Sequence, residues 1–489
     1  MTFLKLAACI TSASLLMACG GDNNSTNNDQ SAGTPTFSIE KAQLVLNTNA
    51  DIAYAAYTDS VETAKILKTA LNNFKADPSV ENLTAAKTAW LVAREPYGQT
   101  EVYRFRNSPV DALDLEGDLN AWPLGEALID YVNTGSDSAG GTGGENSDDF
   151  ENEQIGVTAH GLGDDISANI TVDNASTINA NNNSIIGNTA IAIEPALLAK
   201  GLQAGDEHDV ISGYHAIEFI LWGQDLNTTN GDTTDGTDRD LADNSTANGG
   251  QRPVTDFQPG ITGDTYDSTV LSHRRHQYLA IVVDKLIADL EAVQAAWATG
   301  VADNYRAGFT SIATEADAKQ KLTEILIGMG TLSAGELAGE RIKPAFTKNA
   351  QEDEHSCFSD NTHRDIWLNA EGISNSFYGT YTGYDHDLDP TTADIVSTGI
   401  AAVNGYGIDD YLTDAGLESL VTETQAALTL TETHYTAIDT QARDEGKPFD
   451  VQIMAANRSL TSPAGLTITA LEAQARLFNK ASTDLGLDL

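Results

Sequence analysis

The residues best suited to chemistry in this 489-residue chain are a histidine and a glutamate in the run Gly213-Tyr-His-Ala-Ile-Glu-Phe-Ile-Leu-Trp-Gly223. If this run is helical, His215 and Glu218 lie on one face with their Cβ atoms roughly 5–6 Å apart. A neutral imidazole and a carboxylate at that spacing can share one metal ion, or they can form a hydrogen bond without one. The spacing alone leaves both interpretations open. It is not the zincin pattern H-E-x-x-H, whose second histidine is missing.

A second polar segment, Gln351–His363, offers further metal ligands. It contains Glu352 and His355 at the E-x-x-H spacing, followed by Asp360 and His363. Di-iron helical bundles use E-x-x-H pairs, but they need two such pairs and two more glutamates on facing helices. The single copy predicts a segment that lines a cleft and supplies one or two ligands, or else a hydrogen-bonded structural loop.

Three arginines lie close together in a chain that has few, at Arg94, Arg104 and Arg106. Ion pairs with the abundant carboxylates explain them adequately. A cluster of guanidinium groups could also hold an anionic substrate or a metal-chelate ligand. We favour the structural interpretation slightly.

Helical periodicity dominates the sequence around these segments. It predicts helices over residues 38–74, 79–97, 274–297, 315–337, 392–403, 411–439 and 462–485. Ser79 and Ser462 can each cap a helix, and Pro463 suits the first helical position. Strand signals are few, with a short alternating piece at Ile170. The sequence therefore predicts an all-α chain of the bundle type.

Two low-complexity insertions, at residues 133–153 and 227–250, are rich in Gly, Asp, Asn, Ser and Thr. Such composition is typical of surface loops. The second insertion holds five aspartates that could chelate calcium, Asp232, Asp235, Asp238, Asp240 and Asp243. It does not match the EF-hand spacing, so we expect a solvated acidic loop there, with calcium binding as the alternative.

The charge balance excludes one class of partner. The chain carries 71 acidic and 27 basic residues, a formal net charge of −44. Binding to nucleic acid is excluded on this basis, because no basic stripe can neutralise phosphates. After the N-terminal apolar run, no segment approaches 18 consecutive apolar residues, so we expect no transmembrane helix.

The N-terminus resembles a bacterial lipoprotein signal peptide. Lys5 precedes an apolar run that ends in Leu16-Met-Ala-Cys19, which is similar to a lipobox. This predicts cleavage before Cys19, lipid on its thiol and anchoring to a membrane. Gly20 follows the cysteine, and the aspartate that typically retains lipoproteins at the inner membrane is absent there. We therefore expect an outer-membrane lipoprotein with its soluble domain in the periplasm or at the cell surface.

These features divide the chain into four parts. Residues 1–18 are the expected signal peptide, and 19–37 are a flexible tether of small and polar residues. Residues 38–250 would form an N-terminal helical half that carries the histidine and glutamate, and 251–489 a C-terminal half. The expected fold is thus two packed halves that resemble four-helix bundles, interrupted by acidic loop insertions.

The run at 213–223 closely resembles the G-x-H-x-x-E signature of the imelysin family, the insulin-cleaving membrane proteases and iron-regulated protein A. The segments around 94–105 and 120–131 are similar to the family's N-terminal half, and 351–363 is similar to the iron-regulated protein A branch. The resemblance implies two packed helical bundles, an extracytoplasmic lipoprotein, a link to iron acquisition and a peptidase label. It assigns a functional role only to His215 and Glu218.

Two function classes follow from the residues and the resemblance. In the first, the protein binds a metal ion, iron or zinc, or an iron-bearing ligand in a cleft between its bundles and serves iron uptake with other uptake components. In the second, it is a metallopeptidase. Hydrolysis at a zinc site usually needs three protein ligands, an open position for water and a general base. His215 and Glu218 supply two candidates, so the sequence favours the first class.

Overall fold

The computed structural model describes residues 35–105, 108–122, 124, 126–130, 184–198, 210–223, 250, 252–263, 265–348, 353–388, 395–396, 402–454 and 457–487. The expected signal peptide with Cys19 and most of the tether lie outside the described residues. So do the insertion at 133–153, the short strand expected at Ile170, and all but the last residue of the insertion at 227–250.

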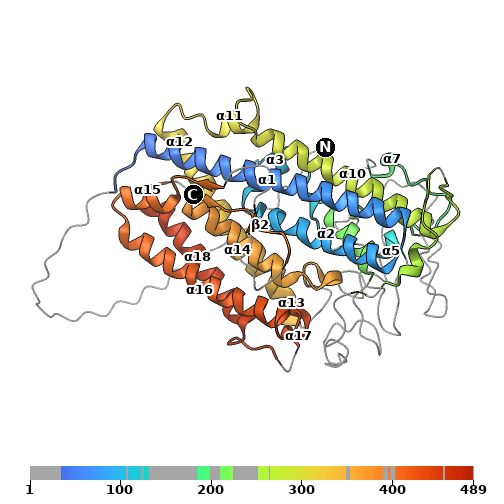
Figure 1. Cartoon of the computed structure of the whole chain (residues 1–489). Coiled ribbons are helices and arrows are strands. Elements are labelled where there is room, and N and C mark those ends of the chain that lie inside the picture. Colours follow the sequence, from blue (N-terminus) through green and yellow to red (C-terminus); the bar gives the residue numbers. More distant parts are fainter. Residues whose placement is uncertain are drawn as a thin grey trace, which may run out of the picture. The chain divides into compact units, whose positions relative to one another are not determined.

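A first group of helices packs around the G-x-H-x-x-E run. It consists of α1 (Ile39–Ala76), α2 (Val80–Gly98), α8 (Gly213–Trp222) and α10 (Leu271–Trp297). Helix α1 packs along both α2 and α10 (Figure 1). Helix α8 packs against α10 and α2. The side chains of Ser38 and Ser79 accept the hydrogen bonds that begin α1 and α2. Helix α10 lies beyond residue 250, so this group takes helices from both sides of that position.

A second group of helices contains a separate apolar cluster. The helices of this group are α12 (Glu315–Gly330), η3 (Thr331–Ile342), α13 (Lys343–Lys348), α14 (Thr362–Tyr378), α16 (Glu418–Arg443), α17 (Phe449–Ile453) and α18 (Pro463–Asp484). Every member except α12 contributes to the cluster, and α12 packs on α18. Helices α16 and α18 pack side by side, and α14 packs on α16 (Figure 1). Ser462 caps α18 and Pro463 is its first residue, as the sequence predicted.

The remaining helices are short. They are η1 (Glu101–Tyr103), α3 (Pro109–Ala112), α4 (Glu116–Leu119), α5 (Glu126–Ile129), α7 (Pro195–Leu198), η2 (Val254–Phe257), α11 (Tyr305–Phe309), η4 (Cys357–Ser359) and α15 (Ile408–Asp414). Two antiparallel pairs of strands join β1 (Thr380–Tyr381) to β4 (Val403–Asn404) and β2 (Tyr384–Asp385) to β3 (Ile395–Val396). The all-α prediction is confirmed. Of the described helices, none is both long and apolar enough to cross a membrane.

Two predictions of local structure are wrong. The helix expected over 392–403 is replaced, where the structure describes it, by strands β3 and β4, whose Ile and Val residues favour extended backbone. The helix expected over 411–439 is broken into α15 and α16 at Gly416, which has φ of +85°. Helix α14 was not among the helices that the sequence predicted.

Candidate functional site

Helix α8 carries the motif and is fixed at its N-terminal end by close backbone packing. Gly213 has φ of +84°, and a Cβ at this position would lie 2.5 Å from the carbonyl oxygen of Leu119. Glycine adopts this conformation without strain and leaves room for the neighbouring backbone. The indole of Trp90 on α2 donates to the carbonyl of Tyr214 over 2.9 Å, which holds the first turn of α8. The motif glycine therefore sets the position of His215.

Glu218 lies beside His215 on the same face of α8, and both side chains are fully buried. Nδ1 of His215 lies 2.8 Å from Oε2 of Glu218. The other carboxyl oxygen, Oε1, accepts hydrogen bonds from the backbone N–H and the hydroxyl of Ser359, at 3.0 and 2.6 Å. Protein groups therefore engage both oxygens of Glu218.

A second imidazole, that of His355 in the loop before η4, faces the first. Nε2 of His355 lies 3.1 Å from Nε2 of His215, and the rings meet edge to face at 86°. Nδ1 of His355 lies 2.5 Å from Oδ2 of Asp365, which is in the first turn of α14. A carboxyl group thus holds Nδ1 of each imidazole, and the two Nε2 atoms face each other.

Asp365 connects the side chains of the histidine pair to helix α2. Its Oδ1 accepts a hydrogen bond of 2.9 Å from Arg94, and its Oδ2 also accepts one of 2.6 Å from the hydroxyl of Ser356. Arg94 is 1% exposed and donates to the amide oxygen of Asn120 as well. The site is therefore built from both helical groups, since α2 and α8 belong to one and α14 to the other.

An aromatic ring lies against the two histidines. The centroid of the Trp122 ring is 4.9 Å from that of His215, 6.1 Å from that of His355 and 5.4 Å from that of Phe358. Trp122 is half-buried, in contrast to the two imidazoles. The indole therefore contacts both imidazoles and is itself more exposed than either of them.

Burial and neighbouring charges together set the charge of the four titratable groups. It lowers the pKa of His355 to about 4 and, together with the neighbouring His355, holds the pKa of His215 well below its usual value. Burial raises the pKa of Glu218 to about 8. Burial also opposes ionisation of Asp365, but Arg94 and His355 outweigh it and keep the pKa of Asp365 far below its ordinary range. Near pH 7 both imidazoles are neutral, Glu218 holds a proton and Asp365 is ionised.

These protonation states give a continuous chain of hydrogen bonds. Protonated Glu218 donates to Nδ1 of His215, whose Nε2–H donates to Nε2 of His355, and Nδ1–H of His355 donates to Asp365. When Glu218 loses its proton, His215 must donate to it from Nδ1. Both Nε2 atoms then turn lone pairs toward each other, an arrangement that calls for a proton or a cation between them.

Two of the remaining sequence candidates, His363 and Asp360, contact groups other than this histidine pair. His363 is on α14, where its Nδ1 contacts Oδ1 of Asp439 on α16 at 2.7 Å. Glu352 lies outside the described residues. The segment at 351–363 therefore contributes His355 directly to the pair.

Asp360 belongs to a separate group of buried carboxylates. One oxygen each of Glu354, Asp360 and Asp450 lies within 4.8 Å of the others. This is the one group of three or more His, Cys, Asp or Glu ligand atoms at that spacing in the described parts of the chain. Like charges so close favour protonation of a member or the presence of a cation. Nothing in the sequence connected Asp450 with this segment.

A cavity of about 700 Å³ opens beside the histidine pair, and His355 and Trp122 are among its lining residues. Its walls come from the segment between α2 and α4 and from η3, which is a π-helix, a form often found at functional sites. Arg104, which also lines the cavity, contacts Glu101, Glu116 and Glu336. The described arginines of the predicted cluster, Arg94 and Arg104, thus form ion pairs, as the favoured interpretation held; Arg106 lies outside the described residues.

Sequence reasoning missed Asp365 and the direct contact between His215 and His355. The signal for Asp365 was present in the helical spacing of the apolar residues that follow it, Ile366, Ala370, Ile373 and Phe377, which predicts the helix that presents it. The contact between His215 and His355 joins residues 140 positions apart, and no local pattern encodes it.

Residues 53–478 match the model of the imelysin family, peptidase family M75. Iron-regulated protein A of Synechococcus elongatus is 33% identical over 73 residues, which make up 15% of this chain and 20% of that relative. The match thus spans about a fifth of the relative's length. A crystal structure from Parabacteroides distasonis, assigned as an iron-regulated protein A precursor, has a TM-score of 0.59 at 16% identity and covers 93% of this chain and 97% of that one. That likeness shows a shared fold.

Proposed function

Because this chain belongs to the imelysin family, we propose that it binds a metal ion between His215 and His355 and serves iron acquisition. The observation that carries the proposal is the pair of Nε2 atoms, buried and 3.1 Å apart, with Nδ1 of each ring held by a carboxyl group. Metal-binding histidines typically donate their other ring N–H to a carboxylate, which fixes the tautomer and the orientation of the ring.

The donor atoms fit one ion. Two imidazole nitrogens that bind a metal at about 2.0–2.1 Å lie roughly 3 Å apart, and the observed separation is 3.1 Å. Imidazole suits iron and zinc alike, so the donor set accepts either metal of the sequence prediction. In this arrangement Glu218 acts on the metal through His215, and Asp365 acts through His355. The names of the relatives, iron-regulated protein A, favour iron as the biological cargo.

The test is calorimetric titration of the purified protein with Zn²⁺, and with Fe²⁺ in the absence of oxygen. We expect His215→Ala and His355→Ala each to weaken binding at least about tenfold, which is about 1.4 kcal/mol. His276→Ala is the matched control, since His276 is also buried and its pKa is also lowered to about 4, but it contacts the carbonyl of Phe257. This variant should lose stability and keep its metal affinity.

A structural role for the pair predicts a different outcome. If His215 and His355 only form a buried hydrogen bond, both variants should lose about 1–3 kcal/mol of unfolding free energy and bind metal as the wild type does. Unchanged affinity in both variants would therefore overturn the proposal. Far-UV circular dichroism of the same samples checks that the helices remain intact.

The alternative function is that of a metallopeptidase. A catalytic zinc usually has three protein ligands and a bound water. In the described residues, no third His, Cys, Asp or Glu forms a close group with the two Nε2 atoms, and Glu218 is engaged by His215 and Ser359. This favours binding over hydrolysis. Metal-dependent cleavage of a peptide library that is lost in His215→Ala would reverse that preference.

We also propose the location that the N-terminal sequence predicts, an outer-membrane lipoprotein anchored through Cys19. The support is the lipobox-like run and the glycine after the cysteine. Membrane fractionation of cells that express the wild type or Cys19→Ser tests the anchor. A wild-type protein that is soluble in the periplasm, with no change in Cys19→Ser, would contradict it.

A further inference from the structure

The cavity beside the histidine pair is lined by an excess of negative charge. Its described lining residues include three cationic side chains, Arg104, Arg341 and Lys348. They also include six carboxylates, Glu101, Asp114, Glu116, Glu336, Glu340 and Asp353. Six negative and three positive groups leave a formal charge of −3 on these walls.

The positive groups of the cavity are already engaged by carboxylates. Arg341 donates to Glu101 over 2.6 Å, and Arg104 lies 3.2 Å from the same carboxylate. Lys348 lies 3.2 Å from Asp353. An anionic ligand that sought these cations would have to displace the carboxylates that hold them. These ion pairs also keep Glu101 ionised. The guanidinium groups of Arg341 and Arg104 outweigh burial and lower the pKa of Glu101 to about 2.

The cavity is lined by exposed acids and by one buried imidazole of the pair. Asp114 and Glu116 are exposed, whereas His355, which also lines the cavity, is 3% exposed. Trp122 lines the same cavity and contacts His215. A concave surface that carries one sign of charge concentrates ions of the opposite sign and raises their association rate.

We propose that this cavity is the entry path for a free, hydrated metal cation and that it excludes anionic metal chelates. The inference rests on the proposed function and adds the class of ligand. The acidic walls attract the cation, and the histidine pair, of which His355 lines the cavity, binds it. A ferric chelate that carries negative charge meets the same walls as a barrier, because the cations lining the cavity are paired.

The experiment measures association rates by stopped-flow mixing with Co²⁺, followed by tryptophan fluorescence. Trp122 lies 4.9 Å from the ring of His215, so a bound ion should quench it. The test variant is Asp114→Asn with Glu116→Gln, which removes two exposed carboxylates. Asp114 has φ of 56°, and asparagine tolerates this conformation, so we expect the variant to fold.

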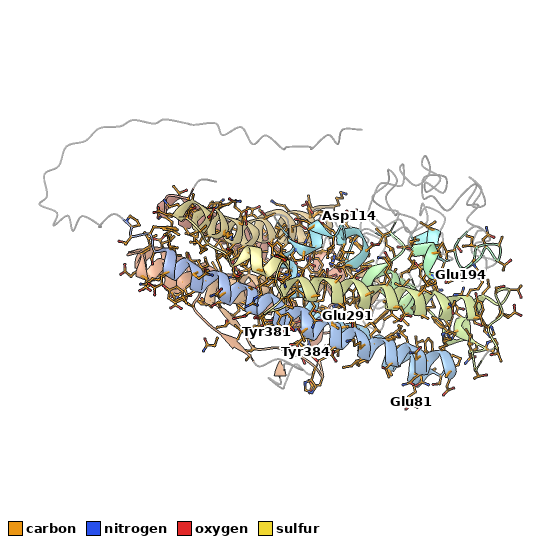
Figure 2. The ribbon with its side chains drawn as sticks, turned by 90° about the horizontal axis from the view of Figure 1, so that it is seen from above. Glu81, Asp114, Glu194, Glu291, Tyr381 and Tyr384 are labelled. Carbon is orange, nitrogen blue, oxygen red and sulfur yellow. The ribbon has the colours of Figure 1, made fainter. Side chains whose placement is uncertain are left out.

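The matched control is Glu81→Gln with Glu194→Gln, which removes the same charge outside the cavity lining. Both residues are exposed and lie away from Asp114 (Figure 2). At about 10 mM salt, where charges act over roughly 30 Å, we expect the cavity variant to bind Co²⁺ about 3–10 times more slowly. The control should match the wild type. At about 1 M salt, where the screening length is roughly 3 Å, all three rates should converge.

A second measurement on the wild type needs no variant. Titration with ferric citrate should give no binding under conditions in which Co²⁺ binds. Tighter binding of the chelate than of the ion would overturn the inference, as would equal rates for the cavity variant and the wild type at low salt. If Co²⁺ does not bind the wild type at all, the proposed function fails and the inference fails with it. Co²⁺ binding that depends on His215 but not on the cavity charge defeats only the inference.

Discussion

Helices α2 and α14 are joined by two buried ion pairs between neighbouring residues, and the pairs differ in what else they contact. Glu95 accepts hydrogen bonds from both Nε and Nη2 of Arg364, at 2.9 and 2.8 Å, so this pair is bidentate. Beside it, Arg94 makes one contact of 2.9 Å with Asp365. The other oxygen of Asp365 contacts His355.

The two pairs have the same charges, the same helices and similar burial, yet different consequences are expected. Both oxygens of Glu95 are bound to Arg364, so this carboxylate contacts neither His215 nor His355. Asp365 divides its oxygens between a guanidinium and an imidazole, and the imidazole reaches the facing Nε2 of His215. Charge and burial therefore do not separate a structural carboxylate from a functional one. The group that the second carboxylate oxygen contacts distinguishes the two.

The largest expected effect is on stability, in Glu95→Gln. Removing one partner of a buried ion pair costs about 3–5 kcal/mol, because the remaining charge stays buried. Asp439, 3.4 Å from Arg364, should keep the loss near the lower end. Urea unfolding measures the loss, and titration with Zn²⁺ should give an affinity close to that of the wild type. A tenfold loss of affinity would place Glu95 in the same network as Asp365.

The second effect is on metal affinity, in Asp365→Asn. Loss of a carboxylate that orients a metal-binding histidine typically weakens metal binding about 10–100-fold, which is about 1.4–2.7 kcal/mol. The chain offers a matched control in Asp439, which contacts Nδ1 of His363 in a similar pair that lies apart from the site. Asp439→Asn should keep its affinity for Zn²⁺. Equal losses in the two variants would mean that both act through stability.

The sequence predicted the helices whose signals are local. Capping residues and apolar spacing gave α1, α2, α10 and α18 to within a few residues. The sequence prediction failed where helical periodicity competed with another local preference, that of a glycine or of β-branched residues. Gly416 broke a helix that periodicity predicted as continuous, and Ile395 and Val396 formed a strand where a helix was expected.

The site was predictable only in part, for a physical reason. The i, i+3 spacing on α8 encoded the contact between His215 and Glu218, which the structure contains. The Nε2–Nε2 contact depends on packing of the loop before η4 against α8, and the sequence holds no periodic signal for it. The carboxylates around His355 were visible as ligand types, but Asp365, its actual partner, was hidden in an unexpected helix.

The smallest effect concerns pH. It distinguishes Glu218 from Asp365, the carboxyl groups at the two ends of the hydrogen-bonded network. Asp365 stays ionised throughout the neutral range, because Arg94 and His355 lower its pKa. Among the described residues, no Lys or Arg contacts Glu218, and burial raises its pKa from 4.5 to about 8. We therefore expect the Glu218 end alone to titrate between pH 6.5 and 8.5, and we expect metal affinity to rise over this range as the proton leaves.

The raised pKa of Glu218 also makes the unfolding free energy of the metal-free protein depend on pH. Between pH 4.5 and 8 the folded metal-free protein holds a proton on Glu218 that the unfolded chain has released, so its unfolding free energy falls as pH rises, by at most about 1.4 kcal/mol per pH unit. The lowered pKa values of His215 and His355 act in the opposite direction as long as the unfolded imidazoles, whose ordinary pKa is about 6.5, remain partly protonated. A reference variant is therefore needed to separate the contribution of Glu218. In Glu218→Gln the amide can donate to Nδ1 of His215 as the protonated acid does, and it cannot ionise. Its unfolding free energy should fall less steeply than that of the wild type, and the difference between the two cancels every other titrating group. Parallel curves would mean that Glu218 is already ionised at pH 6.5, in which case the two Nε2 atoms could not share a hydrogen in the metal-free protein unless one imidazole were charged.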